Sequence, residues 1–100
     1  MKTVPLCLLT VIAEAVLKER LIDDVRHAGA KGYTITSAEG EGVRQRRVSD
    51  ILGANIRLET IVSEEVADRL LRLISTEYFD RHAVIAFLST VNVIRGEKYV

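Results

Sequence analysis

The chain has 100 residues, 48% of them hydrophobic, and its 14 acidic and 14 basic side chains leave a formal net charge of zero. This length predicts one small domain, residues 1–100, that buries a modest part of its surface, so association with other copies would stabilise it. The balanced charge argues against nucleic-acid binding, which usually needs a basic surplus. The single cysteine, Cys7, excludes a disulfide within the chain and predicts a cytoplasmic protein.

The first half of the chain predicts a strand, a helix and a second strand. Residues 4–13 form a near-continuous apolar run that is typical of a buried strand and too short to span a bilayer. Residues 14–28 carry apolar side chains at helical spacing, and Gly29 is suited to end that helix. Residues 33–38 alternate and are rich in β-forming residues, and a polar, glycine-containing loop follows at about 40–53.

The second half predicts a strand, a helix and a last strand. Residues 54–62 alternate, so one face of this strand collects Ile56, Leu58, Thr60 and Val62. Ser63 is placed to cap a helix whose apolar residues are Val66, Leu70, Leu71, Ile74 and Tyr78. Residues 83–94 form the last predicted strand, and a short polar tail follows.

The order β-α-β-β-α-β predicts an α+β, ferredoxin-like sandwich, in which an antiparallel sheet carries both helices on one face. The other face of such a sheet is uncovered, and we expect apolar strand residues, including Val11, Ile85 and Phe87, to lie there. A bare apolar face implies a partner, and another copy of the same chain is the simplest one.

The loop after the second predicted strand is the segment best suited to bind an anion. Gly40 and Gly42 would let the backbone and its N–H groups approach a ligand closely. Three arginines follow within four positions, namely Arg44, Arg46 and Arg47. Their guanidinium groups are forked donors that suit phosphate. Spacing alone nevertheless favours the alternative, a solvated charged loop balanced by neighbouring acidic residues.

Other chemistry has little support in the sequence. His27, His82 and Cys7 are far apart and lack metal-ligand spacing, so we expect surface or core-edge histidines and a buried cysteine, with no metal site. The aromatic pair Tyr78 and Phe79 is expected to anchor the core. No arrangement of nucleophile and base is present, so we expect no catalytic residue and no enzymatic activity.

The segment Gly32-Tyr33-Thr34, followed shortly by residues 39–47 (EGEGVRQRR), resembles the second strand and T-loop of the PII superfamily. Within that superfamily the chain is similar to the PII-like signalling proteins of the SbtB and carboxysome-associated branch. The resemblance extends over essentially the whole chain. It implies a homotrimer that binds adenine nucleotides in clefts between subunits and changes its T-loop, at about 40–53, with the ligand.

The resemblance also assigns roles to particular residues. It implies that Thr34 contacts the adenine and that the other nucleotide-binding residues are Gly40, Gly42, Arg44 and Arg47. Arg95, after the last strand, would correspond to a C-terminal basic residue that reaches the nucleotide of a neighbouring subunit. We also expect a partner-binding part of the loop, formed by Arg46 and by the apolar residues Ile51 and Leu52 further along it. The protein partner would be a membrane bicarbonate transporter or a carboxysome-related protein, so the chain would regulate inorganic-carbon handling.

Two departures from the superfamily narrow the expected ligands. The loop lacks the tyrosine that PII proteins modify, and residues 77–84 (EYFDRHAV) lack the glycines of the PII B-loop. Both departures argue against tight binding of a nucleotide triphosphate and against the sensing of 2-oxoglutarate. The expected regulatory ligands are therefore ADP and AMP, with ATP, cyclic AMP and bicarbonate as further candidates and no permanent cofactor.

Two other functions fit the same architecture. A CutA-like trimer that binds divalent metal is the first alternative, although the arginine-rich loop and the missing ligand spacing count against it. An acylphosphatase-like hydrolase is the second. It would need a phosphate cradle soon after the first strand, where residues 11–14 offer neither glycine nor a basic side chain.

Overall fold

A computed structural model describes residues 1–40 and 55–100. The strands are β1 (Val4–Glu14), β2 (Thr34–Ala38), β3 (Asn55–Val62) and β4 (Ile85–Val93). The α-helices are α1 (Lys18–Ala28) and α3 (Glu64–Glu77), and the short 3-10 helices are η1 (Ala15–Leu17) and η2 (Gly96–Lys98). Within the described residues the strands form a four-stranded antiparallel sheet in the order β2-β3-β1-β4.

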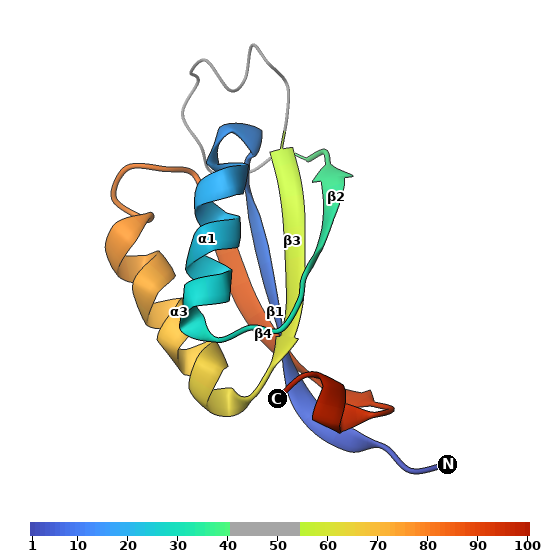
Figure 1. Cartoon of the computed structure of the whole chain (residues 1–100). Coiled ribbons are helices and arrows are strands. Elements are labelled where there is room, and N and C mark those ends of the chain that lie inside the picture. Colours follow the sequence, from blue (N-terminus) through green and yellow to red (C-terminus); the bar gives the residue numbers. More distant parts are fainter. Residues whose placement is uncertain (41–54) are drawn as a thin grey trace.

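Both α-helices pack against the same face of this sheet (Figure 1). The order of elements and the antiparallel pairing confirm the predicted ferredoxin-like sandwich. Among the described residues, no helix is long and apolar enough to cross a membrane.

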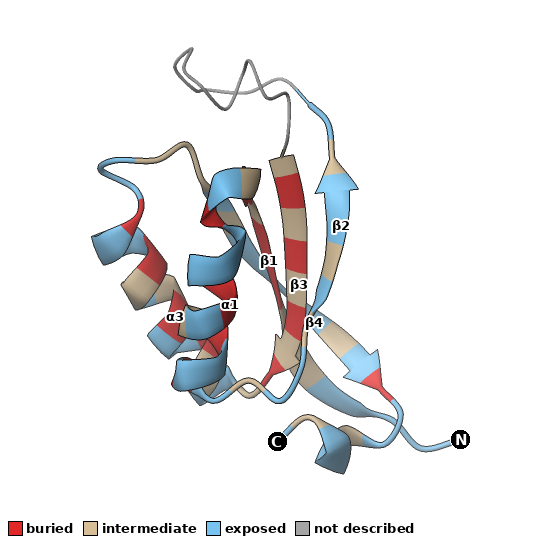
Figure 2. Ribbon diagram, turned by 45° about the horizontal axis from the view of Figure 1, so that its top comes forward, coloured by how far each residue is buried: buried red, intermediate tan, exposed pale blue. Residues whose placement is uncertain are grey.

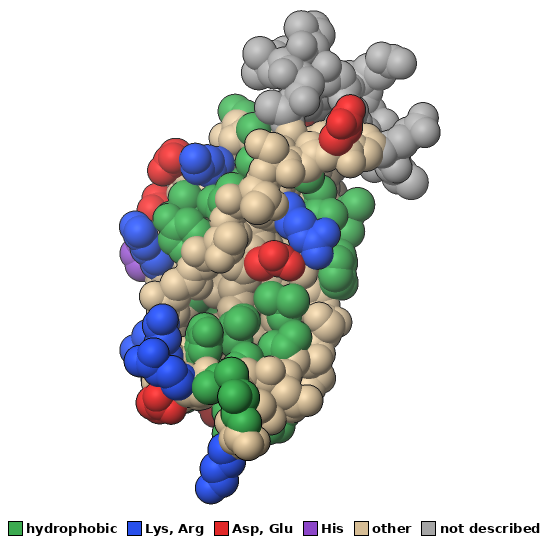
Figure 3. All heavy atoms as spheres, turned by 90° about the vertical axis from the view of Figure 1, so that its right-hand side faces the viewer, with side chains coloured by type: hydrophobic (Ala, Val, Ile, Leu, Met, Phe, Trp, Pro, Cys, Tyr) green, Lys and Arg blue, Asp and Glu red, His purple; other side chains and the backbone are tan. Residues whose placement is uncertain are grey.

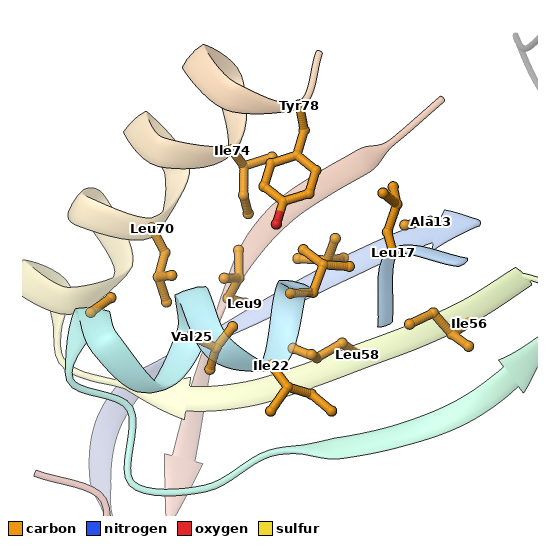
Figure 4. Packing of buried hydrophobic residues seen from close by; sticks show 13 residues of the cluster. Leu9, Ala13, Leu17, Ile22, Val25, Ile56, Leu58, Leu70, Ile74 and Tyr78 are labelled. Atoms are coloured by element: carbon orange, nitrogen blue, oxygen red, sulfur yellow. The ribbon is translucent and has the colours of Figure 1, made fainter. Parts of the chain in front are cut away.

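Strand β3 shows how the sequence pattern builds the core. Its residues alternate between buried and half-buried along its whole length (Figure 2). Ile56, Leu58, Thr60 and Val62 are the buried ones, as predicted. Because successive side chains of a strand point to opposite faces, this set lies on the helix-covered face, where Leu58 joins the core cluster of Figure 4.

The helix ends also follow the sequence signals. Gly29 ends α1 with φ 115°, in the left-handed region that favours glycine, and Ser63 Oγ accepts a hydrogen bond from the Val66 N–H at 3.2 Å. The start of α1 differs from the prediction, because β1 continues to Glu14, which pairs with Asn55 of β3. The turn η1 then separates strand from helix, so α1 begins only at Lys18.

The second face of the sheet carries exposed apolar side chains, as predicted for two of three residues. Ile85 is 50% exposed and Phe87 is 43% exposed. The expectation for Val11 was wrong, since its side chain is fully buried in the core. Val11 pairs with Leu58 and Ala86, so it shares their helix-covered face.

The two aromatic residues at the end of α3 have different environments. Tyr78 is fully buried, and Figure 4 shows its ring projecting between the helices and the sheet. Its hydroxyl donates a hydrogen bond to Asp24 Oδ2 of α1 at 2.5 Å. Phe79 is 49% exposed, so the expectation that it anchors the core was wrong. The end of α3 directs only one of two consecutive side chains toward the core, and that one is Tyr78.

Candidate functional site

A surface hollow of about 310 Å³ lies at the edge of the sheet, where four segments of the chain meet. These segments are β1, the connection from α1 to β2, the end of β3, and the turn that follows β4. The lining residues are Leu8, Lys31, Gly32, Tyr33, Thr34, Glu59, Thr60, Ile61, Lys98 and Tyr99. Residues that are far apart in the sequence therefore line one concave surface, which is the usual form of a small-molecule site.

The connection from α1 to β2 is held against β3 by specific contacts. Gly29 turns the chain sharply at the end of α1. The buried hydroxyl of Thr60 then donates a hydrogen bond to the Gly32 carbonyl at 2.6 Å. Two residues later, Thr34 begins β2 directly opposite Glu59 of β3. The Thr34 and Glu59 side chains therefore lie on the same, helix-free face of the sheet.

The hollow combines polar, charged and aromatic groups. Glu59 is half-buried, and its Oε2 lies 3.3 Å from Arg57 Nη2, which holds the carboxylate in place. Lys31, Lys98 and Tyr99 add two basic residues and one aromatic residue to the lining, whereas Tyr33, which also borders the hollow, packs against the core. The Arg26 guanidinium lies 5.6 Å from the centre of the Tyr33 ring. Such a set suits a planar ligand that carries both hydrogen-bonding groups and negative charge.

Figure 3 views the molecule from the side of β2. Apolar side chains occupy much of this surface, and acidic and basic side chains lie together among them. The apolar residues that line the hollow, Leu8 and Ile61, belong to the same sheet face as Thr34 and Glu59. The hollow is therefore continuous with the helix-free face.

The structure places the residues predicted to bind nucleotide in different regions. Thr34 lines the hollow. Gly40 lies beyond the other end of β2 and is exposed, and no atom of the described residues would lie within 4 Å of a Cβ added there. Arg95 is exposed and precedes η2, and it is not among the residues that line the hollow. The remaining predicted residues lie outside the described part of the chain: Gly42, Arg44, Arg46, Arg47, Ile51 and Leu52.

Sequence reasoning missed four charged or aromatic residues of the hollow, namely Lys31, Glu59, Lys98 and Tyr99. Glu59 occupies a polar position of an alternating strand, which gives no sign of a site. Lys98 and Tyr99 belong to the tail RGEKYV. A basic residue beside an aromatic one was the pattern in this tail that could have indicated a binding site. The family resemblance pointed instead to Arg95 in the same tail.

The histidines and the cysteine have ordinary surroundings. His27 Nδ1 donates a hydrogen bond to the Asp23 carbonyl at 2.7 Å, one turn earlier in α1. The His82 ring lies 6.1 Å from the Tyr78 ring, at the edge of the core. Cys7 is half-buried rather than buried. Among the described residues there is no group of three or more His, Cys, Asp or Glu side chains that could hold a metal ion.

Comparison with known proteins gives consistent matches. The family model described as nitrogen regulatory protein P-II matches residues 6–98. A PII-like signalling protein from Thermus thermophilus is 58% identical, with a TM-score of 0.88 and all of both chains covered. CPII from Thiomonas intermedia, solved bound to ADP, AMP and acetate, is 32% identical with a TM-score of 0.87, covering 99% of this chain and 98% of that one.

A second structure of CPII, bound to ADP and bicarbonate, is 31% identical over 99% of this chain and 98% of that one, with a TM-score of 0.85. These matches extend over nearly the whole chain, including both strands that frame the hollow. This chain belongs to the nitrogen regulatory protein P-II family and is a PII-like signalling protein.

Proposed function

We propose that the chain is a homotrimeric sensor of adenine nucleotides that regulates inorganic-carbon handling, and that it is not an enzyme. The observation that carries the proposal is the position of Thr34, which lies in a hollow together with Glu59 and two lysines. A relative of similar fold, CPII, has been solved with ADP, AMP and bicarbonate. We therefore propose ADP and AMP as the first ligands of this chain and bicarbonate as a second, with ATP and cyclic AMP as weaker candidates.

The proposed site lies between two copies of the chain. Thr34 and Gly40 are separated by the length of β2, about 20 Å along an extended chain. A nucleotide whose base occupies the hollow would therefore meet the loop of a neighbouring copy more directly than the loop of its own chain. Contacts between copies have a suitable surface, because Ile85 and Phe87 expose apolar area on the helix-free face.

The loop after Gly40 would carry the phosphate contacts and the signal. We propose that Gly42, Arg44 and Arg47 bind the phosphates, because glycine N–H groups and forked guanidinium donors suit that group. Arg46 and, further along the loop, Ile51 and Leu52 would contact a protein partner. In the cytoplasmic setting that we propose, this partner is a bicarbonate transporter or a carboxysome-related protein.

Calorimetry on the purified protein tests the proposal directly. AMP, ADP, ATP, cyclic AMP, bicarbonate and divalent metal ions are titrated separately. We expect ADP and AMP to bind, and binding of metal alone would instead support a CutA-like function. Arg44→Ala and Arg47→Ala should each weaken ADP binding by about 1.5–3 kcal/mol, the range for a hydrogen bond to a charged group.

A matched control for these variants is Arg72→Ala, which removes an arginine on the exposed side of α3 whose Nε lies 3.1 Å from Asp68 Oδ2. This variant should bind ADP as the unmodified protein does. Unchanged affinity for ADP in both Arg44→Ala and Arg47→Ala would instead support the alternative, a charged loop that is only solvated.

The regulatory part of the proposal has its own test. Phosphate contacts of Arg44 and Arg47 would restrict the neighbouring backbone, and a ligand shifts a loop only if it binds two loop states unequally. Hydrogen exchange should therefore show greater protection of residues 41–53 with ADP than without it. Equal protection in both conditions would contradict the switch even if ADP binds.

A further inference from the structure

The turn that follows β4 is held in one defined position. Arg95 has φ 61°, in the left-handed region that few non-glycine residues occupy. Two backbone hydrogen bonds of 3.0 Å close the turn, from Lys98 N to the Arg95 carbonyl and from Tyr99 N to the Gly96 carbonyl. Gly96 lies so close to β1 that an added Cβ would overlap the Val4 side chain. The turn therefore folds back against the first strand of the sheet.

This position brings Tyr99 to the hollow. Tyr99 is half-buried and lines the hollow together with the apolar residues Leu8 and Ile61, while Thr34 and Glu59 supply the polar part. The surrounding structure thus holds Arg95 in an unfavourable backbone conformation, and the turn that results places Tyr99 at the hollow. Unfavourable backbone conformations that the surrounding structure holds in place are concentrated at ligand sites.

We propose that Tyr99 is a nucleotide-binding residue that packs its ring against the base of the bound nucleotide. The inference rests on the proposed function, because it takes an adenine nucleotide as the ligand of the hollow. Aromatic rings pack well on the planar face of a base, and the hydroxyl of a half-buried tyrosine can remain in water. An ordinary structural role is the competing explanation: Tyr99 would only hold the turn against the apolar surface of β1.

A set of substitutions separates these two roles. Tyr99→Phe keeps the ring, Tyr99→Leu keeps apolar bulk without a ring, and Tyr99→Ala removes both. Phe79→Ala is the control, because Phe79 is also a partly exposed aromatic residue but follows α3 and does not line the hollow. Adenosine and ADP are titrated into each full-length variant by calorimetry, with circular dichroism to confirm that the fold is retained.

We expect Tyr99→Ala and Tyr99→Leu to weaken both ligands by roughly tenfold, the effect of losing one stacked base contact. The affinity of Tyr99→Phe for both ligands should remain within about twofold of that of the unmodified protein, and the affinity of Phe79→Ala should be unchanged. Equal affinities in Tyr99→Leu and Tyr99→Phe would overturn the inference in favour of the structural role. A loss for ADP but not for adenosine would also overturn it, because the contact would then lie at the phosphates.

The same titrations distinguish failure of the inference from failure of the proposed function. If the unmodified protein binds ADP and every Tyr99 variant binds it equally well, only the role of Tyr99 is wrong. If the unmodified protein binds neither adenosine nor ADP, the proposed nucleotide site is wrong, and the inference falls with it.

Discussion

The buried hydroxyl of Tyr78 joins the two helices, and its removal is a sharp test of the packing described above. Tyr78→Phe retains the fully buried ring and its contact with the Arg20 guanidinium, which lies 4.3 Å from the ring centre. The variant removes only the hydrogen bond to Asp24 Oδ2, which is 2.5 Å long. The measured change in stability should therefore report this one interaction.

The expected cost at neutral pH follows from the surroundings of Asp24. A hydrogen bond to a charged group contributes about 1.5–3 kcal/mol. Asp24 is half-buried, so its carboxylate regains some water when the hydroxyl is lost. We therefore expect Tyr78→Phe to lower the free energy of unfolding by about 1–2 kcal/mol. Urea unfolding, followed by circular dichroism at one fixed protein concentration, measures this difference.

The pH dependence gives a second and independent readout. Burial, and then the hydrogen bond and charge of Asp24, raise the pKa of Tyr78 above its ordinary value of 10.0. Above pH ~10 the unfolded chain loses the phenolic proton while the folded chain keeps it, so the free energy of unfolding falls as pH rises. This fall has a limiting slope of about 1.4 kcal/mol per pH unit for the single group.

Tyr78→Phe lacks this contribution, so the stability difference between the two proteins should be constant from about pH 7 to 9 and should shrink above pH ~10. All other side chains are the same in both proteins, so their contributions cancel in the comparison. Asp24→Asn serves as a control that keeps an acceptor atom and removes the charge. Equal stability of the two proteins at pH 7, or a difference that stays constant up to pH ~11, would refute the reasoning.

Two further substitutions test the fold and the proposed assembly. Gly29→Ala forces a side chain into φ 115° and places a Cβ 3.4 Å from Val66 Cγ2, so it should cost about 1–2 kcal/mol in urea unfolding. A cost below a few tenths of a kcal/mol would contradict the left-handed turn. Phe87→Lys puts a charge on the apolar, helix-free face and should shift the protein from trimer to monomer in sedimentation. The matched variant Phe79→Lys should leave the assembly intact, and equal behaviour of the two would contradict an interface on the sheet.

Local patterns were sufficient to predict most of the elements and several of their ends. The alternation of β3 selected its buried face correctly, because one-sided burial of a strand leaves a period of two in the sequence. Gly29 and Ser63 marked helix ends because the left-handed turn and the unpaired N–H groups at those positions favour these residue types. Thr34, which the family resemblance and not a local pattern singled out, lines the hollow, and its contact with adenine stays a prediction.

Features without a local pattern were decided only by the tertiary structure. The apolar run of β1 has no alternation, so only its pairing with Leu58 and Ala86 shows on which face of the sheet Val11 lies. Similarly, the hydrogen bond between the Tyr78 hydroxyl and Asp24 joins residues 54 positions apart on two helices, so no local pattern predicts it.

The hollow itself is the clearest case of a feature that the sequence alone could not reveal. Residues 31–34, Glu59 and Tyr99 meet because antiparallel pairing aligns β2 with β3 and because the turn after β4 folds back on β1. The sequence by itself therefore determined which segments become strands and helices, since those choices depend on neighbouring residues. The tertiary structure alone decided which distant side chains share a surface, because that depends on strand register and on how one turn packs against another segment.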